Sequence, residues 1–301
     1  MSDAGYQLAS DKGATLPRDD SLGNAPLLTV AQMDAGSREG RIWLALELSQ
    51  EELEEAHGQR METRTELYWD PAAEEVRARR IRYLDALELS SRETSTPTGP
   101  EVSRLLLDAI RTRGIGALAL PRGAEQLLAR VQLAASFDTR GTWPDLSEEA
   151  LMKDLETWLL PWLEGKHSLK EVRKLDWCAL FESLLSWEQQ QELNRLLPSH
   201  WIFDDGSRVS IDYTRRPPVL AVPAQQLYGT CQTPSVMRGR LPLQLHLLTP
   251  AGRPIQVTTD LAHFWKNGWE AVRKEMRGRY PKHHWPEAPE KARPVRLKRN
   301  L

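Results

Sequence analysis

The chain has 301 residues, a net charge of -2 and 40% hydrophobic and 27% charged residues. This length can bury a sizeable core and suits two domains, and the composition is typical of a soluble globular protein. No run approaches the ~18 apolar residues that span a bilayer, and the first residues lack the apolar core of a signal peptide. Cys178 and Cys231 lie too far apart to predict a disulfide framework or a thiolate zinc site. We therefore expect a cytoplasmic protein without a membrane partner.

The N-terminal third is predicted to be rich in β-strands. A capping box at Ser49 and Glu52 is expected to begin a short helix that ends at Gly58. Apolar and β-branched runs predict strands at 26–33, 41–48, 61–69 and 74–84. These elements suit a first domain over 1–93, built either as a five-stranded barrel of the OB type or as a loose β-sandwich.

A change of composition and period marks the expected domain boundary. Residues 90–100 are rich in Ser, Thr, Pro and Gly, so we predict a linker at 94–100 and a second domain over 101–301. Its first part, 101–197, shows a helical period, with Ser168–Glu171 and Ser186–Gln189 as capping boxes. The predicted helices lie at about 100–112, 121–136, 147–164, 168–184 and 187–197.

The last part of the chain, 198–301, returns to strands before a final helix. A hairpin is predicted at 200–213 around Asp205-Gly206, with strands at 218–222 and 241–250. Asp260 is expected to cap a helix that ends near Met276. Its predicted inward residues are Leu261, Phe264, Trp265, Trp269, Val272 and Met276. The fold class is therefore α+β, with a small OB-like domain followed by a mixed helical and antiparallel β domain.

No catalytic motif emerges from the sequence. It contains no GxxxxGK[ST] phosphate loop, no GxSxG and no HExxH. Gly114-Ile-Gly116 imitates a dinucleotide fingerprint, but it follows a predicted helix and runs into Pro121. Glu54 to His57 differs by one letter from a DEAH box, but lies within a capped amphipathic helix, where a magnesium-holding acid is not expected. We predict no catalytic residue and no bound cofactor in this chain.

The charge is unevenly distributed along the chain. Residues 1–100 contain 11 Lys and Arg against 19 Asp and Glu, whereas 261–301 contain 11 against 4. The basic C-terminal end is therefore the candidate surface for a polyanion, although a solvated helix face gives the same count. The cations expected to point outward from the final helix are Lys266, Arg273, Lys274 and Arg277.

The segment "GRYPKHHWPEAP" at 278–289 allows three interpretations. Its prolines and aromatic residues favour a stiff tail that docks on its own domain. Alternatively, Tyr280, His284 and Trp285 stack on bases while Arg279 and Lys282 contact phosphates. Docking and RNA contact are compatible, because a docked segment can still expose its cations. A metal site is the third interpretation, but adjacent histidines in an extended segment point to opposite sides, so we predict none.

A second cluster of cations falls on the strand predicted at 74–84. Alternation places Arg77 and Arg79 on one face, followed by Ile81 and Tyr83, and puts Arg80 and Arg82 on the other face. Arg77 and Arg79 are candidate contacts for a nucleic-acid strand. The alternative is a solvated edge strand.

Several long segments carry a resemblance to one family. They are "YQLASDKGATL", "WPDLSEEAL", "SHWIFDDGSRVSIDY", "PPVLAV", "LYGTCQTPSV", "GRLPLQLHLLTPAGRPIQVTTDLAHFW" and "RKEMRGRYPKHHWPEAP". In order and content they resemble the C-terminal half of HrpB-type bacterial helicases of the DEAH/RHA class. The similarity covers nearly the whole chain and is most specific from Pro198 onward.

The resemblance implies an ATP-dependent helicase acting on RNA, with its OB-like module at residues 1 to about 90 and its C-terminal extension in the remainder. ATP and magnesium would bind in motor domains that this sequence lacks. The sequence is accordingly expected to be a fragment or a truncated reading frame. Two functions remain open: a nucleic-acid-binding and scaffolding part of a helicase, inactive alone, or a protein interaction module that binds no nucleic acid. The expected partners are single-stranded RNA or another nucleic acid, and the helicase motor domains.

Overall fold

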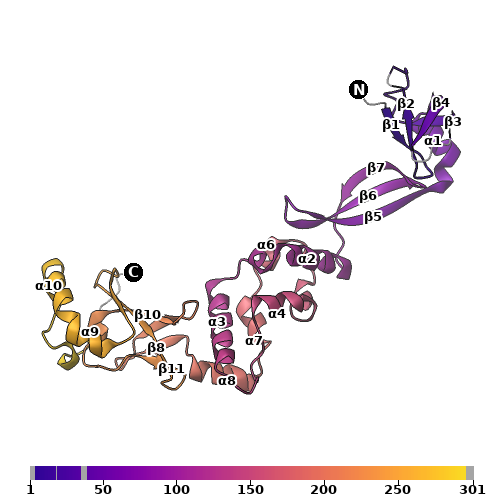
Figure 1. Ribbon diagram of the computed structural model, residues 1–301. Helices are drawn as coiled ribbons and strands as arrows, with labels where there is room; N and C mark the ends of the chain where they lie inside the picture. The colour runs from indigo at the N-terminus through magenta and orange to yellow at the C-terminus, as the bar shows by residue number, and fades with distance from the viewer. Residues whose placement is uncertain (1–3, 18, 35–38, 296–301) are drawn as a thin grey trace. The chain divides into compact units, whose positions relative to one another are not determined.

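The computed structural model describes residues 4–17, 19–34 and 39–295 (Figure 1). The protein contains both helices and sheets, which confirms the α+β class. Its internal contacts define two compact units, Met1–Arg113 with Leu159–Val172, and Gly114–Trp158 with Arg173–Leu301. The expected linker at 94–100 lies inside the first unit, and a division of the chain at that linker stays a prediction.

The first unit begins with a four-stranded sheet in the order β1-β2-β4-β3. Its strands are β1 (Ala4–Gln7), β2 (Gly13–Leu16), β3 (Leu28–Met33) and β4 (Glu39–Glu47). Ala14, Leu16, Ile42 and Ala45 form its buried core. β1 and β2 were not predicted, since four-residue strands offer too few positions for an alternating pattern to stand out.

The helix expected after the second predicted strand is α1 (Gln50–His57). The Ser49 hydroxyl accepts a hydrogen bond from the Glu52 backbone N–H at 3.2 Å, and the Glu52 carboxylate accepts one from the Ser49 backbone N–H at 2.9 Å. This reciprocal pairing confirms the capping box. A single turn of 3-10 helix, η1 (Gly58–Arg60), then leads into the next strand.

A separate three-stranded antiparallel sheet contains β5 (Met61–Asp70), β6 (Glu75–Leu84) and β7 (Leu87–Thr94). Figure 1 shows these strands side by side, with β6 in the centre. β7 was not predicted, and its pairing with β6 continues through the Ser- and Thr-rich residues 90–94, up to the start of the expected linker. The strands of the N-terminal third therefore form two sheets, and an OB-like module stays a prediction.

Helical segments cover one end of the β5–β7 sheet within the first unit. They are α2 (Pro100–Arg113), η3 (Leu160–Leu163) and α6 (Leu169–Val172). α2 contacts β5, β6 and η3. Val76 and Ala78 of β6 are buried, and the Val76 backbone N–H donates to the His167 carbonyl at 2.7 Å.

The helical part of the second unit is more broken than the sequence predicts. It contains η2 (Ile115–Leu118), α3 (Arg122–Ser136), α4 (Glu148–Lys153), α5 (Leu155–Trp158), α7 (Trp177–Glu182) and α8 (Trp187–Leu196). The helix expected at 147–164 is interrupted after α4 and again before η3, where Pro161 lacks the N–H that a continuing α-helix requires. The helix expected at 168–184 ends at Val172 and restarts at Trp177, where the Asp176 side chain caps the Ala179 N–H.

A buried arginine joins α3 to the end of α8. Arg130 donates to the Leu197 carbonyl at 2.7 Å and to the Asn194 side chain at 2.6 Å. The carbonyl group would otherwise lack a partner at the helix terminus. At the other end of α8, Ser186 and Gln189 form the predicted capping box.

The second unit also holds a five-stranded sheet in the order β14-β13-β10-β9-β8. Its strands are β8 (His200–Ile202), β9 (Arg208–Asp212), β10 (Val219–Pro223), β13 (Gln244–Leu248) and β14 (Pro254–Thr258). The predicted hairpin around Gly206 is confirmed as β8 and β9. β10 and β13 pair in parallel and depart from the expected antiparallel pattern, because the long connection between them permits a crossover. That connection contains η4 (Ala224–Leu227), β11 (Ser235–Val236) and β12 (Leu241–Pro242).

The final predicted helix is two helices, α9 (Leu261–Asn267) and α10 (Trp269–Arg279). They meet at Gly268, where an added Cβ would lie only 2.8 Å from the Phe264 ring. Asp260 accepts from the His263 N–H at 2.9 Å, as the predicted cap requires. The inward set is confirmed, with Val272 half-buried and the other five members buried. The single turn η5 (Pro289–Lys291) lies near the end of the described chain.

Candidate nucleic-acid interface

The segment after α10 folds back onto its own unit. Trp285 is buried and its ring lies 5.9 Å from the ring of Trp269. The indole N–H of Trp285 donates to the Tyr280 carbonyl at 3.1 Å, and that of Trp269 donates to the Pro286 carbonyl at 2.8 Å. The structure therefore gives Trp285 a core position and leaves no open ring face on which a base could stack.

Further hydrogen bonds hold this segment against the loop that follows η4. The Tyr228 hydroxyl donates to the His284 carbonyl at 3.2 Å, and the Gly229 backbone N–H donates to the Pro289 carbonyl at 2.9 Å. Tyr228 is itself buried against Trp265 and Trp269, and burial raises the pKa of its hydroxyl. The phenol therefore stays protonated and able to donate.

Arg273 belongs to this docking contact. Its guanidinium donates to the Trp285 carbonyl at 3.1 Å and to the Glu287 carboxylate at 2.6 Å, and only 20% of its side chain is exposed. The structure thus places Arg273 in an internal contact, whereas the sequence suggested an outward cation. Arg279 points outward but pairs with Glu275 at 3.4 Å, one turn earlier on α10.

Four other cations that the sequence offered as candidates in this region are exposed. Lys266 lies on α9, Lys274 and Arg277 lie on α10, and Lys282 lies in the docked segment. In the part of the chain that the structure describes, none of the four has a carboxylate within ion-pair distance. Lys274 and Arg277 are three residues apart and therefore neighbours on one helix face. We call these four residues the C-terminal cations.

The other two predicted stacking residues of the segment, Tyr280 and His284, are only partly available to a base. Tyr280 is half-buried beside His283, with ring centres 6.1 Å apart. His284 is exposed, with its ring 6.4 Å from that of Tyr228. Of the predicted stacking residues, His284 and part of Tyr280 are thus accessible, and Trp285 is not.

Over the described ranges, no three His, Cys, Asp or Glu side chains come close enough together to hold a metal ion. His283 and His284 therefore have no additional ligand there. Nor does any helix within those ranges combine the length and apolar character needed to cross a bilayer.

Arg77 and Arg79 on β6 face carboxylates. Arg77 lies within ion-pair distance of three acids, the nearest being Glu75 at 2.7 Å. Arg79 pairs with Glu66 at 3.2 Å across the sheet. A hydrogen bond from the Tyr83 hydroxyl, followed by one from Arg79, lowers the pKa of Glu66, so this carboxylate is charged at neutral pH. A phosphate at these positions would have to displace existing ion pairs.

The other face of the same sheet carries an open pair of cations. Arg80 on β6 and Arg92 on β7 are direct cross-strand partners, and both are exposed. Neither has a carboxylate partner within the described residues. Alternation placed Arg80 on this face, but neither residue was offered as a candidate contact, because the register of β7 was not predicted and alternation alone cannot show which face holds the acids.

The first sheet has an apolar surface of its own. Trp43, Leu44 and Leu46 of β4 are 58%, 56% and 70% exposed. The guanidinium of Arg41 lies 4.8 Å from the centre of the Trp43 ring. Three large apolar side chains on one exposed strand are typical of a surface that another protein surface covers.

Comparisons with known proteins point to one helicase family. The HrpB C-terminal model, described as "ATP-dependent helicase C-terminal", matches residues 158–289. The chain is 38% identical over 300 residues to the ATP-dependent RNA helicase HrpB of Escherichia coli (strain K12), which covers 98% of the chain and 37% of that protein. The chain thus spans little more than a third of this relative's length.

Two solved structures agree with this match. The crystal structure of the E. coli DExH-box NTPase HrpB is 36% identical with a TM-score of 0.64, covering 99% of this chain and 37% of that one. The crystal structure of the Escherichia coli DEAH/RHA helicase HrpB is 35% identical with a TM-score of 0.55, covering 94% of this chain and 36% of that one.

Proposed function

Because this chain corresponds to the C-terminal region of HrpB-type helicases, we propose that it is an accessory nucleic-acid-binding and scaffolding region of an ATP-dependent helicase. Its partners are single-stranded RNA and helicase motor domains, which would hold ATP and magnesium. The name of the E. coli relative, an RNA helicase, supports RNA as the nucleic acid. The proposed setting is the bacterial cytoplasm.

One observation carries the nucleic-acid part of the proposal. The C-terminal cations are exposed and lack carboxylate partners among the described residues, while the segment that carries Lys282 is fixed by Trp285 and Arg273. Unpaired cations on a preorganised surface can contact phosphates without first breaking internal ion pairs. Arg77 and Arg79, which are already paired, are weaker contributors in this account.

A specific observation also favours the scaffolding part. The apolar surface of Trp43, Leu44 and Leu46 is suited to cover by another protein surface, and we assign it to the motor part of an HrpB-type helicase. The length of the E. coli relative supports this occupant, since most of that protein lies outside the region matched here. If the chain bound motor domains but no RNA, it would be a protein interaction module instead.

The test measures binding to a fluorescent single-stranded RNA by anisotropy. A variant with Lys266, Lys274, Arg277 and Lys282 changed to Gln should bind at least tenfold more weakly, because each lost phosphate contact removes favourable counterion release. The control changes Arg104, Lys153, Lys170 and Lys174 to Gln. These residues are also exposed, and the control removes the same number of charges from three Lys and one Arg.

The control should keep at least half of the RNA affinity. Equal weakening in both variants would show that only net charge matters, and unchanged binding in the first variant would refute the proposal. Circular dichroism would verify that both variants fold. We also expect the chain alone not to hydrolyse ATP, because its sequence has no phosphate loop.

A further inference from the structure

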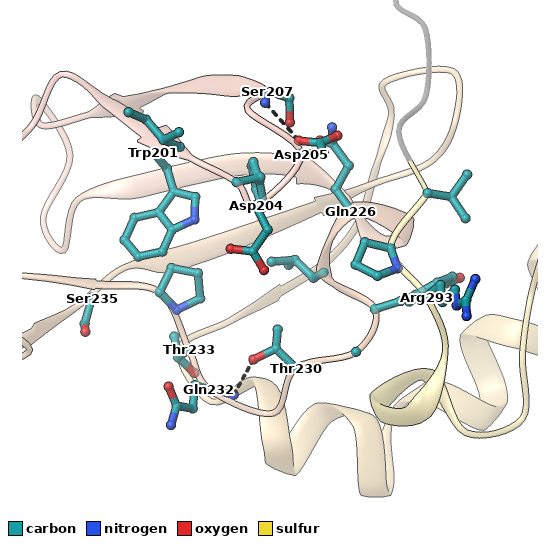
Figure 2. Close-up of a pocket in the computed structure, with 18 residues that line it drawn as sticks. Trp201, Asp204, Asp205, Ser207, Gln226, Thr230, Gln232, Thr233, Ser235 and Arg293 are labelled. Carbon is teal, nitrogen blue, oxygen red and sulfur yellow. Dashed lines mark hydrogen bonds between the residues drawn. The ribbon is translucent and has the colours of Figure 1, made fainter.

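A pocket of about 700 Å³ in the second unit is not used by the proposed cationic surface. Three segments line it: the β8–β9 hairpin, the loop from η4 to β11, and the end of the described chain at Arg293 to Val295. Figure 2 shows the side chains from these segments around one open space. Hydrogen bonds fix the last segment there, since the Val295 backbone N–H donates to the Gln225 carbonyl at 2.9 Å.

The pocket has one flat aromatic wall with a carboxylate near it. Trp201 of β8 is half-buried, and Figure 2 shows its indole and the Asp204 carboxylate turned toward the same space. Asp204 is exposed and has no hydrogen-bond or ion-pair partner among the described residues. Its two oxygens are thus available to accept hydrogen bonds from a group that lies on the indole.

Hydroxyl groups line other parts of the pocket. Thr230 Oγ1 accepts from the Gln232 backbone N–H at 3.1 Å, and Thr233 Oγ1 accepts from the Leu261 N–H at 3.0 Å. Each hydroxyl hydrogen therefore remains free to donate to a ligand. Ser207 also lines the pocket, but its Oγ is buried beneath the pocket surface, so a ligand in this space does not reach it, and it has no hydrogen-bond partner among the described residues.

A single cation completes the lining. Arg293 comes from the end of the described chain and lies on the side of the pocket opposite Trp201 (Figure 2). It is exposed and has no carboxylate partner in the described part of the chain. The pocket thus combines an aromatic wall, carboxylate acceptors, hydroxyl donors and one guanidinium.

We propose that this pocket binds one guanine nucleotide. The base stacks on Trp201, and its N1–H and N2–H groups form two parallel hydrogen bonds with the Asp204 carboxylate. Among the four RNA bases, guanine alone has two adjacent donors on its Watson–Crick edge. The hydroxyls of Thr230 and Thr233 serve the sugar and base oxygens, and Arg293 contacts the phosphate.

A cationic peptide side chain fits the same lining less well. Arginine could stack on Trp201 and pair with Asp204, but it would leave the hydroxyl donors unused and would be repelled by Arg293. If the guanine nucleotide is a residue of single-stranded RNA, this proposal specifies the RNA that the chain binds and rests on the proposed function. If it is a free nucleotide, the proposal does not depend on RNA binding.

The first test compares RNA 10-mers of uridine that carry one central guanosine or one central adenosine. The unmodified protein should bind the guanosine RNA about tenfold more tightly, and Asp204→Asn should abolish this preference, because the amide offers one acceptor and one donor. Binding to all-uridine RNA should stay within twofold. The control, Glu149→Gln, also removes one exposed carboxylate in the second unit and should keep the preference.

The second test titrates GMP, AMP and a triarginine peptide into the ¹⁵N-labelled protein. GMP should shift the amide signals of residues 201–207 and 230–235, and AMP should shift them less.

Shifts with GMP but no guanosine preference in RNA would identify the free nucleotide as the ligand. The proposal is overturned if guanosine gives neither preference nor shifts, if Asp204→Asn retains the preference, or if only the peptide shifts these signals. Loss of the C-terminal cations should weaken all RNAs equally, which separates failure of the proposed function from failure at this pocket.

Discussion

Neighbouring residues of the C-terminal region have different roles despite similar chemistry. Arg273 is held by Trp285 and Glu287, while Arg277, one helical turn later, is exposed and unpaired within the described chain. The helical period predicts which apolar residues face inward, and it did so correctly for Trp269 and Met276. It cannot predict that the segment around Trp285, twelve residues further along the chain, folds back and accepts hydrogen bonds from Arg273, because this is a tertiary contact.

A substitution at Gly229 tests whether the C-terminal segment packs against the loop that follows η4. Its φ of +83° disfavours any side chain, and an added Cβ would lie 2.9 Å from the Ala292 carbonyl oxygen. We expect Gly229→Ala to lower the free energy of unfolding by about 2–4 kcal/mol, because it adds a steric clash to backbone strain of about 1–3 kcal/mol. Urea denaturation measures this difference.

Gly252 provides the matched control for this prediction. Its φ is +78°, but an added Cβ would meet no atom within 4 Å. Gly252→Ala should therefore show the backbone strain without the clash. Equal losses in the two variants would indicate that the C-terminal segment does not press against Gly229.

At the scale of elements, the sequence predicted which segments form helices better than where they break. α2, α3 and α8 lie where expected, whereas the expected long helices are interrupted next to Pro161 and at Gly268. Simple alternation also fails in β4, where Ile42 and Ala45 are both buried although they are three residues apart. An irregularity in the pairing with β3 between these positions turns the strand, and such a bulge has no clear sequence signal.

The loop between α3 and α4 gives a prediction for pH dependence. The Thr142 hydroxyl donates to Asp138 at 2.6 Å, and the backbone N–H groups of Arg140, Thr142 and Trp143 donate as well. These bonds lower the pKa of Asp138 to about 2. A carboxyl whose folded pKa is depressed stabilises the protein above its unfolded pKa of about 4 and loses this contribution as the pH falls toward 2.

Asp138→Asn should therefore lower the Tm at pH 6, and its difference from the unmodified protein should shrink between pH 4 and pH 2. NMR titration of the Asp138 carboxyl carbon measures the pKa directly. A midpoint near 4 would show that the loop does not stabilise the charged form.

For the whole molecule, the family resemblance pointed to HrpB-type helicases, whereas local sequence patterns predicted only the class of fold. Periodicity suggested an α+β chain, but the parallel pairing of β10 with β13 and the two compact units are set by contacts distant in sequence. The pocket beside Trp201 is a further example, since its lining comes from residues near 205, 230 and 294. Conversely, the basic C-terminal end was visible from charge alone, although Arg296, Lys298 and Arg299 lie outside the described residues.

In the function that we propose, the C-terminal cations bind single-stranded RNA through its phosphates. Each such contact contributes about -0.7 to the slope of log affinity against log salt concentration. Four contacts therefore account for a slope of about -2.8. This quantity counts the contacts themselves, and it is less sensitive than affinity at one salt concentration to small changes in folding.

The most direct measurement is this salt slope, determined between 50 and 300 mM KCl for the unmodified protein and for the variant with Lys266, Lys274, Arg277 and Lys282 changed to Gln. Our account predicts that the variant's slope is shallower by about 2–3, in line with four lost contacts. An unchanged slope, in a variant shown to be folded, would contradict it and would place any RNA contact elsewhere, with Arg80 and Arg92 as the next cations to test.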